Sequence, residues 1–410
     1  MNAFFIIILA AVLAEYALGI VSNVLNLSAL KPQAPAGLED LYDPEKYQKS
    51  QEYTKVNTGF DMITSTFTLA VLLTFWFLSG FNELDLVVRG WGFPVLVEGV
   101  LYIGILGLAY ILITLPFSIY GTFVIEEQFG FNKTTWGTFI IDKVKGLGLG
   151  IALGVPLLAA ILAFFEYAGD LAWLYAWVAV TIVTLAIQFI APTWIMPLFN
   201  KFTPLESGEL REAILDYARS VNFTLDNILV MDGSKRSSKA NAFFTGFGKN
   251  KRIALFDTLM ETQTVPELVS VLAHEIGHYK KKHIIQNMVV SIVHTAIIFF
   301  LLSIFLNNEG LFDAFFMDEM SVYAGLLFFG MLYTPVELVL SIVLQHISRK
   351  HEYEADRWSL ETYERPEELS SALKKLSAEN LSNLAPHPFY VLLNYTHPPL
   401  VERVRAIERK

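Results

Sequence analysis

The chain has 410 residues, no cysteine and a formal net charge of −10; 54% of its residues are apolar and only 17% are charged. This composition, with a mean hydropathy of +0.46, excludes an ordinary soluble protein, because runs of about twenty apolar residues recur and predict membrane spans. The lack of cysteine excludes disulfides and thiolate metal sites, and the negative charge argues against nucleic acid as a partner.

Seven apolar runs have the length of membrane-spanning helices. No Lys or Arg precedes the first run, so we interpret it as a span rather than as a cleaved signal peptide. In chain order the predicted spans cover about residues 3–23, 61–81, 95–118, 146–166, 171–198, 286–306 and 322–345.

The distribution of positively charged residues predicts the orientation of the chain in the membrane. With seven spans, 29 of the 30 Lys and Arg residues share one side of the membrane, and only Arg89 lies on the other. The positive-inside rule therefore places four segments in the cytoplasm, namely 24–60, 119–145, 199–285 and 346–410.

The predicted spans carry ionisable residues at depths where hydrocarbon is unfavourable for them, namely Glu15, Glu98 and Glu337. Such groups usually face the interior of a helix bundle or a water-filled cavity. The alternative is that one or two of them lie near a membrane interface.

The long polar stretch 199–285 is expected to contain both helices and strands. Residues 205–221 have the pattern of an amphipathic helix, residues 227–232 that of a strand, and 239–246 with 252–257 that of a hairpin around Gly248-Lys249-Asn250. A further helix is predicted to start after Thr264, because Thr264 followed by Glu267 forms a capping box.

This last helix carries the pattern H-E-x-x-H, from His274 to His278. On a helix, residues four apart share a face, so both imidazoles can bind one metal ion, and Glu275 is placed to take a proton from a water on that metal. The constellation is that of a zinc peptidase. The alternative is an amphipathic helix that has one buried and one exposed histidine.

A catalytic zinc usually has three protein ligands, so a third is needed. Glu352 and Asp356 are four residues apart on a predicted helix; one can bind the metal while the other orients a ligand histidine. His351 points about 100° away from Glu352 on a helix and would not converge with it. The alternative is a solvated helix face that pairs with Arg349 or Arg357.

The tail contains two further candidates, His397 and Arg403, whose side chains can donate hydrogen bonds to an oxyanion. The remaining histidines outside the motifs are interpreted as structural or surface residues: His283, His294, His346 and His387.

Together, these motifs resemble the type I CAAX prenyl proteases, a family of integral-membrane zinc peptidases. The resemblance is carried by seven spans, HEIGH between spans five and six, E-x-x-x-D after span seven, a late H-P-x-L-x-E-R, and the segment KANAFFTGFGKNKRIALFDTL. It implies an all-α integral membrane fold: a seven-helix transmembrane barrel around a water-filled chamber. A zincin-like α/β metalloprotease core caps the cytosolic end.

The resemblance also implies a role for each matching residue. One Zn²⁺ per chain would be held by two histidines and a glutamate. A second glutamate would be the general base, and an aspartate would orient one of the ligand histidines. The corresponding residues are His274, His278 and Glu352 for the metal, Glu275 for the base, Asp356 behind a ligand, Asn241 and Ala242 for pairing with the substrate backbone, and His397 and Arg403 for the tetrahedral intermediate or substrate positioning.

These inferences divide the chain into four predicted regions. They are residues 1–198 with spans one to five, 199–285 as a cytosolic metalloprotease segment, 286–345 with spans six and seven, and 346–410 as a cytosolic tail that completes the zinc site.

The predicted function is zinc-dependent endopeptidase activity at the lipid bilayer. The substrate would be a membrane-associated or C-terminally prenylated CAAX-type peptide or protein. The site would face the cytosol, from the endoplasmic reticulum membrane in a eukaryote or the inner or plasma membrane in a prokaryote.

Three alternatives belong to other classes. A membrane quality-control protease with the same site would have no prenyl requirement. A seven-span transporter or receptor does not predict the capped H-E-x-x-H helix, and a lipid-binding scaffold with a degenerate site is disfavoured because Glu275 is present.

Overall fold

The computed structural model describes residues 2–35, 38, 44–225, 227–245 and 252–409. Within them, seven helical segments are long and apolar enough to cross a membrane, and each overlaps one predicted span. They are α1 (Ala3–Ser28), α2 (Pro44–Phe77), α4 (Val95–Tyr120) with η1 (Gly121–Glu126), α5 (Trp136–Leu149) with η2 (Gly150–Gly154) and α6 (Val155–Tyr167), η3 (Gly169–Leu171) with α7 (Ala172–Ile190), η4 (Ala191–Ile195) and α8 (Met196–Phe199), α12 (His283–Phe305), and α14 (Val322–Tyr363).

Several of these helices continue well beyond the apolar run that predicted them. Helix α2 begins at Pro44, so much of the expected polar loop 24–60 is helical, and α14 runs for 42 residues. A bilayer needs only about twenty helical residues. Because no Gly or Pro interrupts residues 346–363, α14 continues into the predicted tail. The third ligand candidate is thus on the same helix as span seven.

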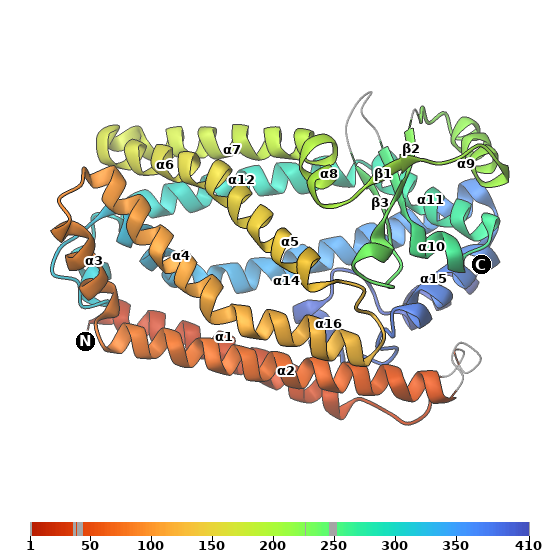
Figure 1. The fold of residues 1–410 in the computed structure, drawn as a ribbon, viewed down its shortest axis with the longest axis horizontal. Helices are drawn as coiled ribbons and strands as arrows, with labels where there is room; N and C mark the ends of the chain where they lie inside the picture. Colours follow the sequence, from red (N-terminus) through yellow and green to blue (C-terminus); the bar gives the residue numbers. More distant parts are fainter. Residues whose placement is uncertain (1, 36–37, 39–43, 226, 246–251, 410) are drawn as a thin grey trace.

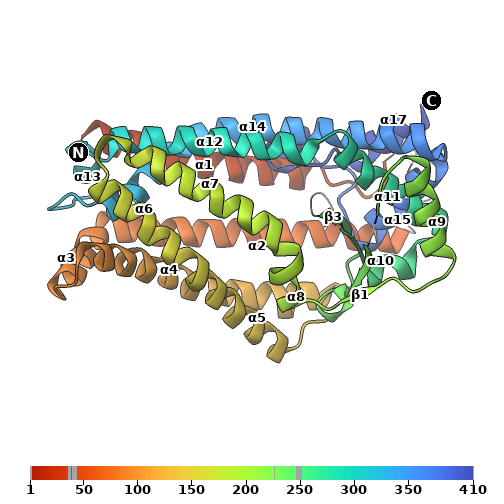
Figure 2. The same ribbon diagram turned by 90° about the horizontal axis from the view of Figure 1, so that it is seen from above.

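The seven spans form a ring. Helix α1 packs on α2 and α14, α4 on α6, α6 on α7, α7 on α12, and α12 on α14. Contacts of Phe60 and Phe67 with Phe117 join α2 to α4 and close it. Figures 1 and 2 show these helices along the long axis of the molecule. Only 6–17% of the residues in their most apolar windows are buried against protein, so most of these side chains face the bilayer or the interior of the ring. The expected seven-helix ring is confirmed.

An aromatic core fills the end of the ring near α3 (Gly80–Gly90) and α13 (Glu309–Asp313). The rings of Trp76 and Phe328 stack on either side of Phe315, with centroids 4.6 and 3.8 Å away. Glu98 is buried here, and the next residue on its helix, Gly99, packs against Leu162 and Tyr323. This end of the ring is therefore closed by side chains.

The opposite end carries a small mixed sheet, visible in Figure 1 beside α9 and α11. Its order is β1-β2-β4-β3, with β2 parallel to β4, and β3 antiparallel to β4 as the hairpin prediction required. The predicted turn at Gly248-Lys249-Asn250 lies outside the described residues. The strands are β1 (Phe202–Pro204), β2 (Asn227–Met231), β3 (Ala242–Thr245) and β4 (Arg252–Phe256).

Helices surround this sheet and bury a second core. The predicted amphipathic helix is α9, which starts at Glu209, four residues later than expected. The helices of this end are α9 (Glu209–Ser220), α10 (Asp257–Thr262), α11 (Val265–Lys280), α15 (Pro366–Glu379), α16 (Pro388–Asn394) and α17 (Leu400–Glu408). The fold is thus a membrane ring with an α/β unit at one end.

Helix α11 is the centre of this unit. Its predicted capping box is present: the Thr264 amide donates to Glu267 Oε2 at 2.7 Å, and the Glu267 amide donates to Thr264 Oγ1 at 3.4 Å. At Gly277, an added Cβ would lie 3.0–3.2 Å from Trp358 and Ala355 of α14. Glycine therefore permits the close approach of α11 to α14.

Candidate metal centre

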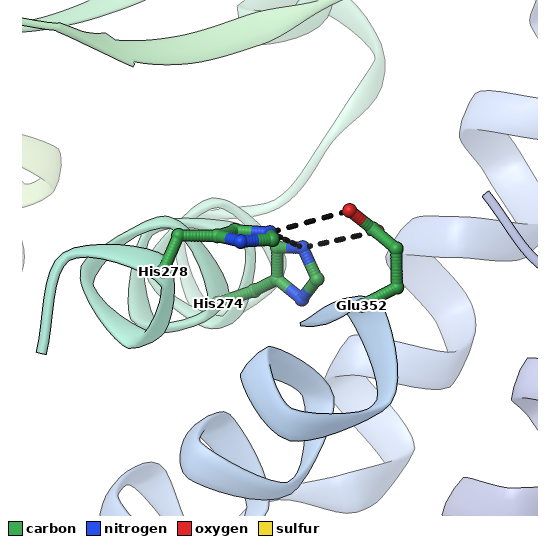
Figure 3. A group of neighbouring side chains, drawn as sticks. All are labelled: His274, His278 and Glu352. Atoms are coloured by element: carbon green, nitrogen blue, oxygen red, sulfur yellow. Dashed lines mark hydrogen bonds and ion pairs between the residues drawn. The ribbon is translucent and has the colours of Figure 1, made fainter. Parts of the chain in front are cut away.

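Three ligand atoms from α11 and α14 converge on one point, as Figure 3 shows. The Nε2 atoms of His274 and His278 are 3.1 Å apart. Glu352 Oε1 lies 3.3 Å from His278 Nε2, and Oε2 lies 3.5 Å from His274 Nε2. The structure thus brings together the two histidines and the glutamate that the resemblance selected as the metal ligands.

The chemistry of these residues fits a metal ion. Glu352 is 5% exposed, and its Oε2 atom has no hydrogen bond within the described residues, only contacts with Arg403 Nη1 at 3.4 Å and His274 Nε2 at 3.5 Å. Both contacts are longer than a good hydrogen bond, so a metal cation can still compensate this buried oxygen. Two imidazoles and one carboxylate also form the ligand set of a catalytic metal with an open position. The solvated-face alternative for Glu352 and Asp356 is wrong, because Asp356 is only 4% exposed.

Asp356 holds the ligand His274 from behind. The Nδ1 atom of His274 lies 2.8 Å from Asp356 Oδ1, while Arg403 donates to both oxygens of Asp356, at 2.6 and 2.9 Å. Burial alone would lower the pKa of His274, but the hydrogen bond to Asp356 and the nearby carboxylate of Glu352 outweigh it and raise that pKa to about 9. A metal must therefore displace a proton from His274.

Glu275 follows His274 on α11 and is half-buried. Burial lowers the pKa of Arg403, but the negative charges of Asp356, Glu352 and Glu275 raise it above its usual value. Glu275 is thus close enough to act electrostatically on the group behind the ligands. The role of general base that the motif predicts for Glu275 stays a prediction.

The two tail candidates reach the site by different routes. His397 Nε2 lies 3.4 Å from Glu352 Oε1, and 65% of the His397 side chain is exposed. Arg403 Nη1 lies 3.4 Å from Glu352 Oε2, but Arg403 is 8% exposed and already bonded to Asp356. His397 is accessible to a bound molecule, whereas Arg403 is buried and bonded to Asp356.

A cavity of about 450 Å³ opens beside these two residues. Polar side chains, among them Asn380, Asn383 and Tyr395, line it together with His397 and Arg403. Amide and hydroxyl groups of this kind can hydrogen-bond to a peptide backbone.

Asn241 and Ala242 lie at the start of β3, which is an edge strand of the described sheet. Strand β3 contacts α11, the helix that carries His274 and His278. Asn380 fixes the preceding residue: it accepts from the Ala240 amide at 3.0 Å and donates to the Ala240 carbonyl at 3.1 Å. The sequence analysis missed Asn380, since a contact across 140 residues has no local pattern.

Comparisons with known proteins agree with this architecture. The family model described as CAAX prenyl protease N-terminal, five membrane helices, matches residues 23–201, and the model of peptidase family M48 matches residues 204–410. CAAX prenyl protease 1 of Saccharomyces cerevisiae is 37% identical over 401 residues, covering 91% of this chain and 88% of the relative. The CAAX prenyl protease 1 homolog of Arabidopsis thaliana is 37% identical over 397 residues, covering 93% and 92%.

The fold also matches a solved structure. The crystal structure of S. mikatae Ste24p superposes with a TM-score of 0.94 at 34% identity, and the match covers 100% of both chains. The two family models together cover nearly the whole chain, and the second covers the residues of the His-His-Glu group. The chain therefore belongs to the type I CAAX prenyl proteases of peptidase family M48 and is a multi-pass membrane metallopeptidase.

Proposed function

We propose that the chain is a zinc-dependent endopeptidase that cleaves C-terminally prenylated CAAX-type peptides or proteins at the membrane. The observation that carries the zinc assignment is the convergence of His274, His278 and Glu352, with one buried carboxylate oxygen lacking a hydrogen bond. The substrate class is supported by relatives named CAAX prenyl protease 1, which align over most of both chains. A bound zinc supplies Lewis acidity, which polarises a peptide carbonyl and lowers the pKa of a bound water to about 7.

The residues around the metal position divide the remaining chemistry. Glu275 accepts a proton from the attacking water and then delivers it to the leaving amine. His397, exposed beside Glu352, donates a hydrogen bond to the oxyanion of the tetrahedral intermediate. Arg403 holds Asp356, and Asp356 holds His274 with its Nε2 directed at the metal position.

The edge of β3 provides a binding site for an extended substrate peptide. Asn241 is exposed, and β3 has a sheet partner on one side only within the described strands. An extended peptide can add to such an edge through backbone hydrogen bonds, which sets which bond lies beside the metal. The cavity lined by Asn380 and His397 receives the chain on the far side of that bond.

We also propose that the metal centre faces the cytosol. Besides its substrate, the protein interacts with the lipid bilayer and not with nucleic acid. Of the 30 Lys and Arg residues, Arg89 alone falls on the side assigned to the exterior, and its helix α3 lies at the end of the molecule opposite the sheet (Figure 1). The relatives named above are eukaryotic, which favours the endoplasmic reticulum membrane.

The test uses the full chain purified in detergent. Zinc per chain is measured together with cleavage of a farnesylated CAAX peptide and its unprenylated twin, for the wild type and for Glu275→Gln. We expect one zinc in both proteins, a preference for the farnesylated peptide, and turnover about 10²- to 10⁴-fold lower in the variant.

Two other results would change the assignment. Equal cleavage of both peptides would favour the quality-control alternative over the prenyl requirement. A protein with neither zinc nor cleavage would overturn the peptidase proposal.

A further inference from the structure

The two ligand histidines are held differently on the side away from the metal. His274 Nδ1 meets the carboxylate of Asp356 directly, at 2.8 Å. His278 Nδ1 instead lies 3.0 Å from Nδ1 of a third histidine, His283. The other nitrogen of His283 lies 3.0 Å from Glu354 Oε2. His283 thus lies between His278 and the carboxylate of Glu354, whereas His274 contacts its carboxylate directly.

A local break in the helix places His283 there. Helix α11 ends at Lys280, and Lys282 adopts the left-handed conformation, with φ of 63°. This turn starts α12 at His283 and directs its ring back toward His278, five residues earlier. On a continuous helix, residues five apart would not share a face.

The hydrogen bonds of His283 specify one tautomer for each ring. When His278 presents Nε2 to a metal, its proton must be on Nδ1, which then donates to His283 Nδ1. The proton of a neutral His283 is consequently on Nε2, where it donates to Glu354. In the hydrogen-bonded series His278–His283–Glu354, each nitrogen that carries a proton then faces an acceptor.

The ring of His283 is also fixed in place. It is 2% exposed and stacks on His351, with centroids 4.0 Å apart and an angle of 9° between the planes. His351 in turn bonds through Nε2 to Gln286 Oε1 at 3.0 Å. The stacking restrains the plane of His283, and its two hydrogen bonds restrain rotation within that plane.

We propose that His283 is a positioning residue for the metal centre. With Glu354 behind it, His283 sets the tautomer and the orientation of His278, as Asp356 does for His274. The inference rests on the proposed function, because it requires a metal bound at His278 Nε2.

Two substitutions separate hydrogen bonding from packing at this position. His283→Phe keeps a flat ring against His351 but removes both nitrogens. His283→Gln loses the ring, but its carbonyl can accept from His278 and its amide can donate to Glu354. His346→Phe, at an exposed histidine of α14, is the matched control.

The measurements are the zinc dissociation constant, by competition with a chelator in detergent, and the visible spectrum of the Co²⁺-loaded protein. We expect His283→Phe to weaken zinc binding about 10- to 100-fold and to shift the cobalt bands. His283→Gln and His346→Phe should remain close to the wild type. Glu354→Ala should weaken binding less, since its side chain is 38% exposed, and should add nothing to His283→Phe.

Wild-type zinc affinity and an unchanged cobalt spectrum in His283→Phe would overturn the inference while leaving the proposed function standing. A larger loss in His283→Gln than in His283→Phe would also overturn it, because packing would then carry the effect. A wild-type chain that binds no metal would instead refute the proposed function, and the inference would fall with it.

Discussion

Two buried aspartates, each paired with an arginine, lie at opposite ends of the molecule. Asp85, 1% exposed, accepts from Arg89 Nε at 2.7 Å and from the Tyr323 hydroxyl at 2.5 Å. Asp356, 4% exposed, accepts from Arg403 and faces a ring nitrogen of His274. The two aspartates are about equally buried, although 27% of the Arg89 side chain and only 10% of the Arg403 side chain is exposed.

The difference lies in the third member of each group. Tyr323 has one polar atom, and behind it is the aromatic core, so the network at Asp85 ends there. His274 has a second nitrogen, which points at His278 and Glu352. A buried ion pair is therefore weak support for function by itself. Ligand atoms that converge beyond the pair are what distinguish the metal end.

The largest contrast is expected between Glu352→Ala and Asp85→Ala. Removing Glu352 takes away a ligand, so zinc content and cleavage should both be lost. Removing Asp85 leaves Arg89 with Glu319, 3.0 Å away, and leaves the Tyr323 hydroxyl without its acceptor; it should cost about 1–3 kcal/mol of stability, with zinc content unchanged. Metal analysis and thermal unfolding of both variants test this, and zinc loss from Asp85→Ala would contradict the separation of the two ends.

Asp356→Asn should have the next largest effect. The amide keeps the shape of the side chain but removes the charge that orients His274 and neutralises Arg403. We expect zinc affinity to fall about 10- to 100-fold. Asp85→Asn is the matched control and should bind zinc as the wild type does; equal losses in the two would contradict the account.

Gly277→Ala tests the close contact between the two metal-bearing helices. Its Cβ would lie 3.0 Å from the Trp358 side chain and 3.1 Å from the Ala355 backbone, so α11 and α14 must separate. We expect a loss of about 1–3 kcal/mol of stability and weaker zinc binding. Gly146→Ala on α5, where a Cβ meets nothing within 4 Å, should show neither change.

The smallest expected effect concerns the start of the metal helix and depends on pH. Burial raises the pKa of Glu267, but hydrogen bonds from Lys375, Ser371 and Thr264 outweigh it and lower that pKa below 4.5. The charged form therefore stabilises the fold above about pH 4.5, and this contribution is lost as the pH falls through the lower folded-state value.

Glu267→Gln should thus cost about 0.5–1 kcal/mol at pH 7 and nothing in strong acid. Unfolding measured across this range tests the prediction. Glu83→Gln, at an exposed acid in the first turn of α3, is the control for the same change of side chain at another helix start. A penalty that is constant with pH would show that the charge of Glu267 is not its cause.

Much of the metal centre was predictable because it depends on local spacing. His274 and His278 share a helical face at a separation of four, and so do Glu352 and Asp356. Spacing alone did not decide whether that second pair faces solvent or metal. The resemblance selected Glu352 as the ligand, and the structure brings its carboxylate to the histidines.

The parts that sequence reasoning missed depend on breaks in periodicity or on distant contacts. His283 reaches His278 only because Lys282 leaves the helical conformation, and Asn380 meets Ala240 across 140 residues. Hydropathy marked where each span is apolar, not where its helix ends. The extension of α14 to Tyr363 therefore became evident only in the structure.

The central claim is that one zinc ion is held by His274, His278 and Glu352. Anomalous diffraction at the zinc edge, from crystals of the active protein, tests it most directly. The account predicts one anomalous peak per chain, about 2.0–2.2 Å from Nε2 of each histidine and from a carboxylate oxygen of Glu352. An active protein with no peak there, or with its zinc at other residues, would contradict the account.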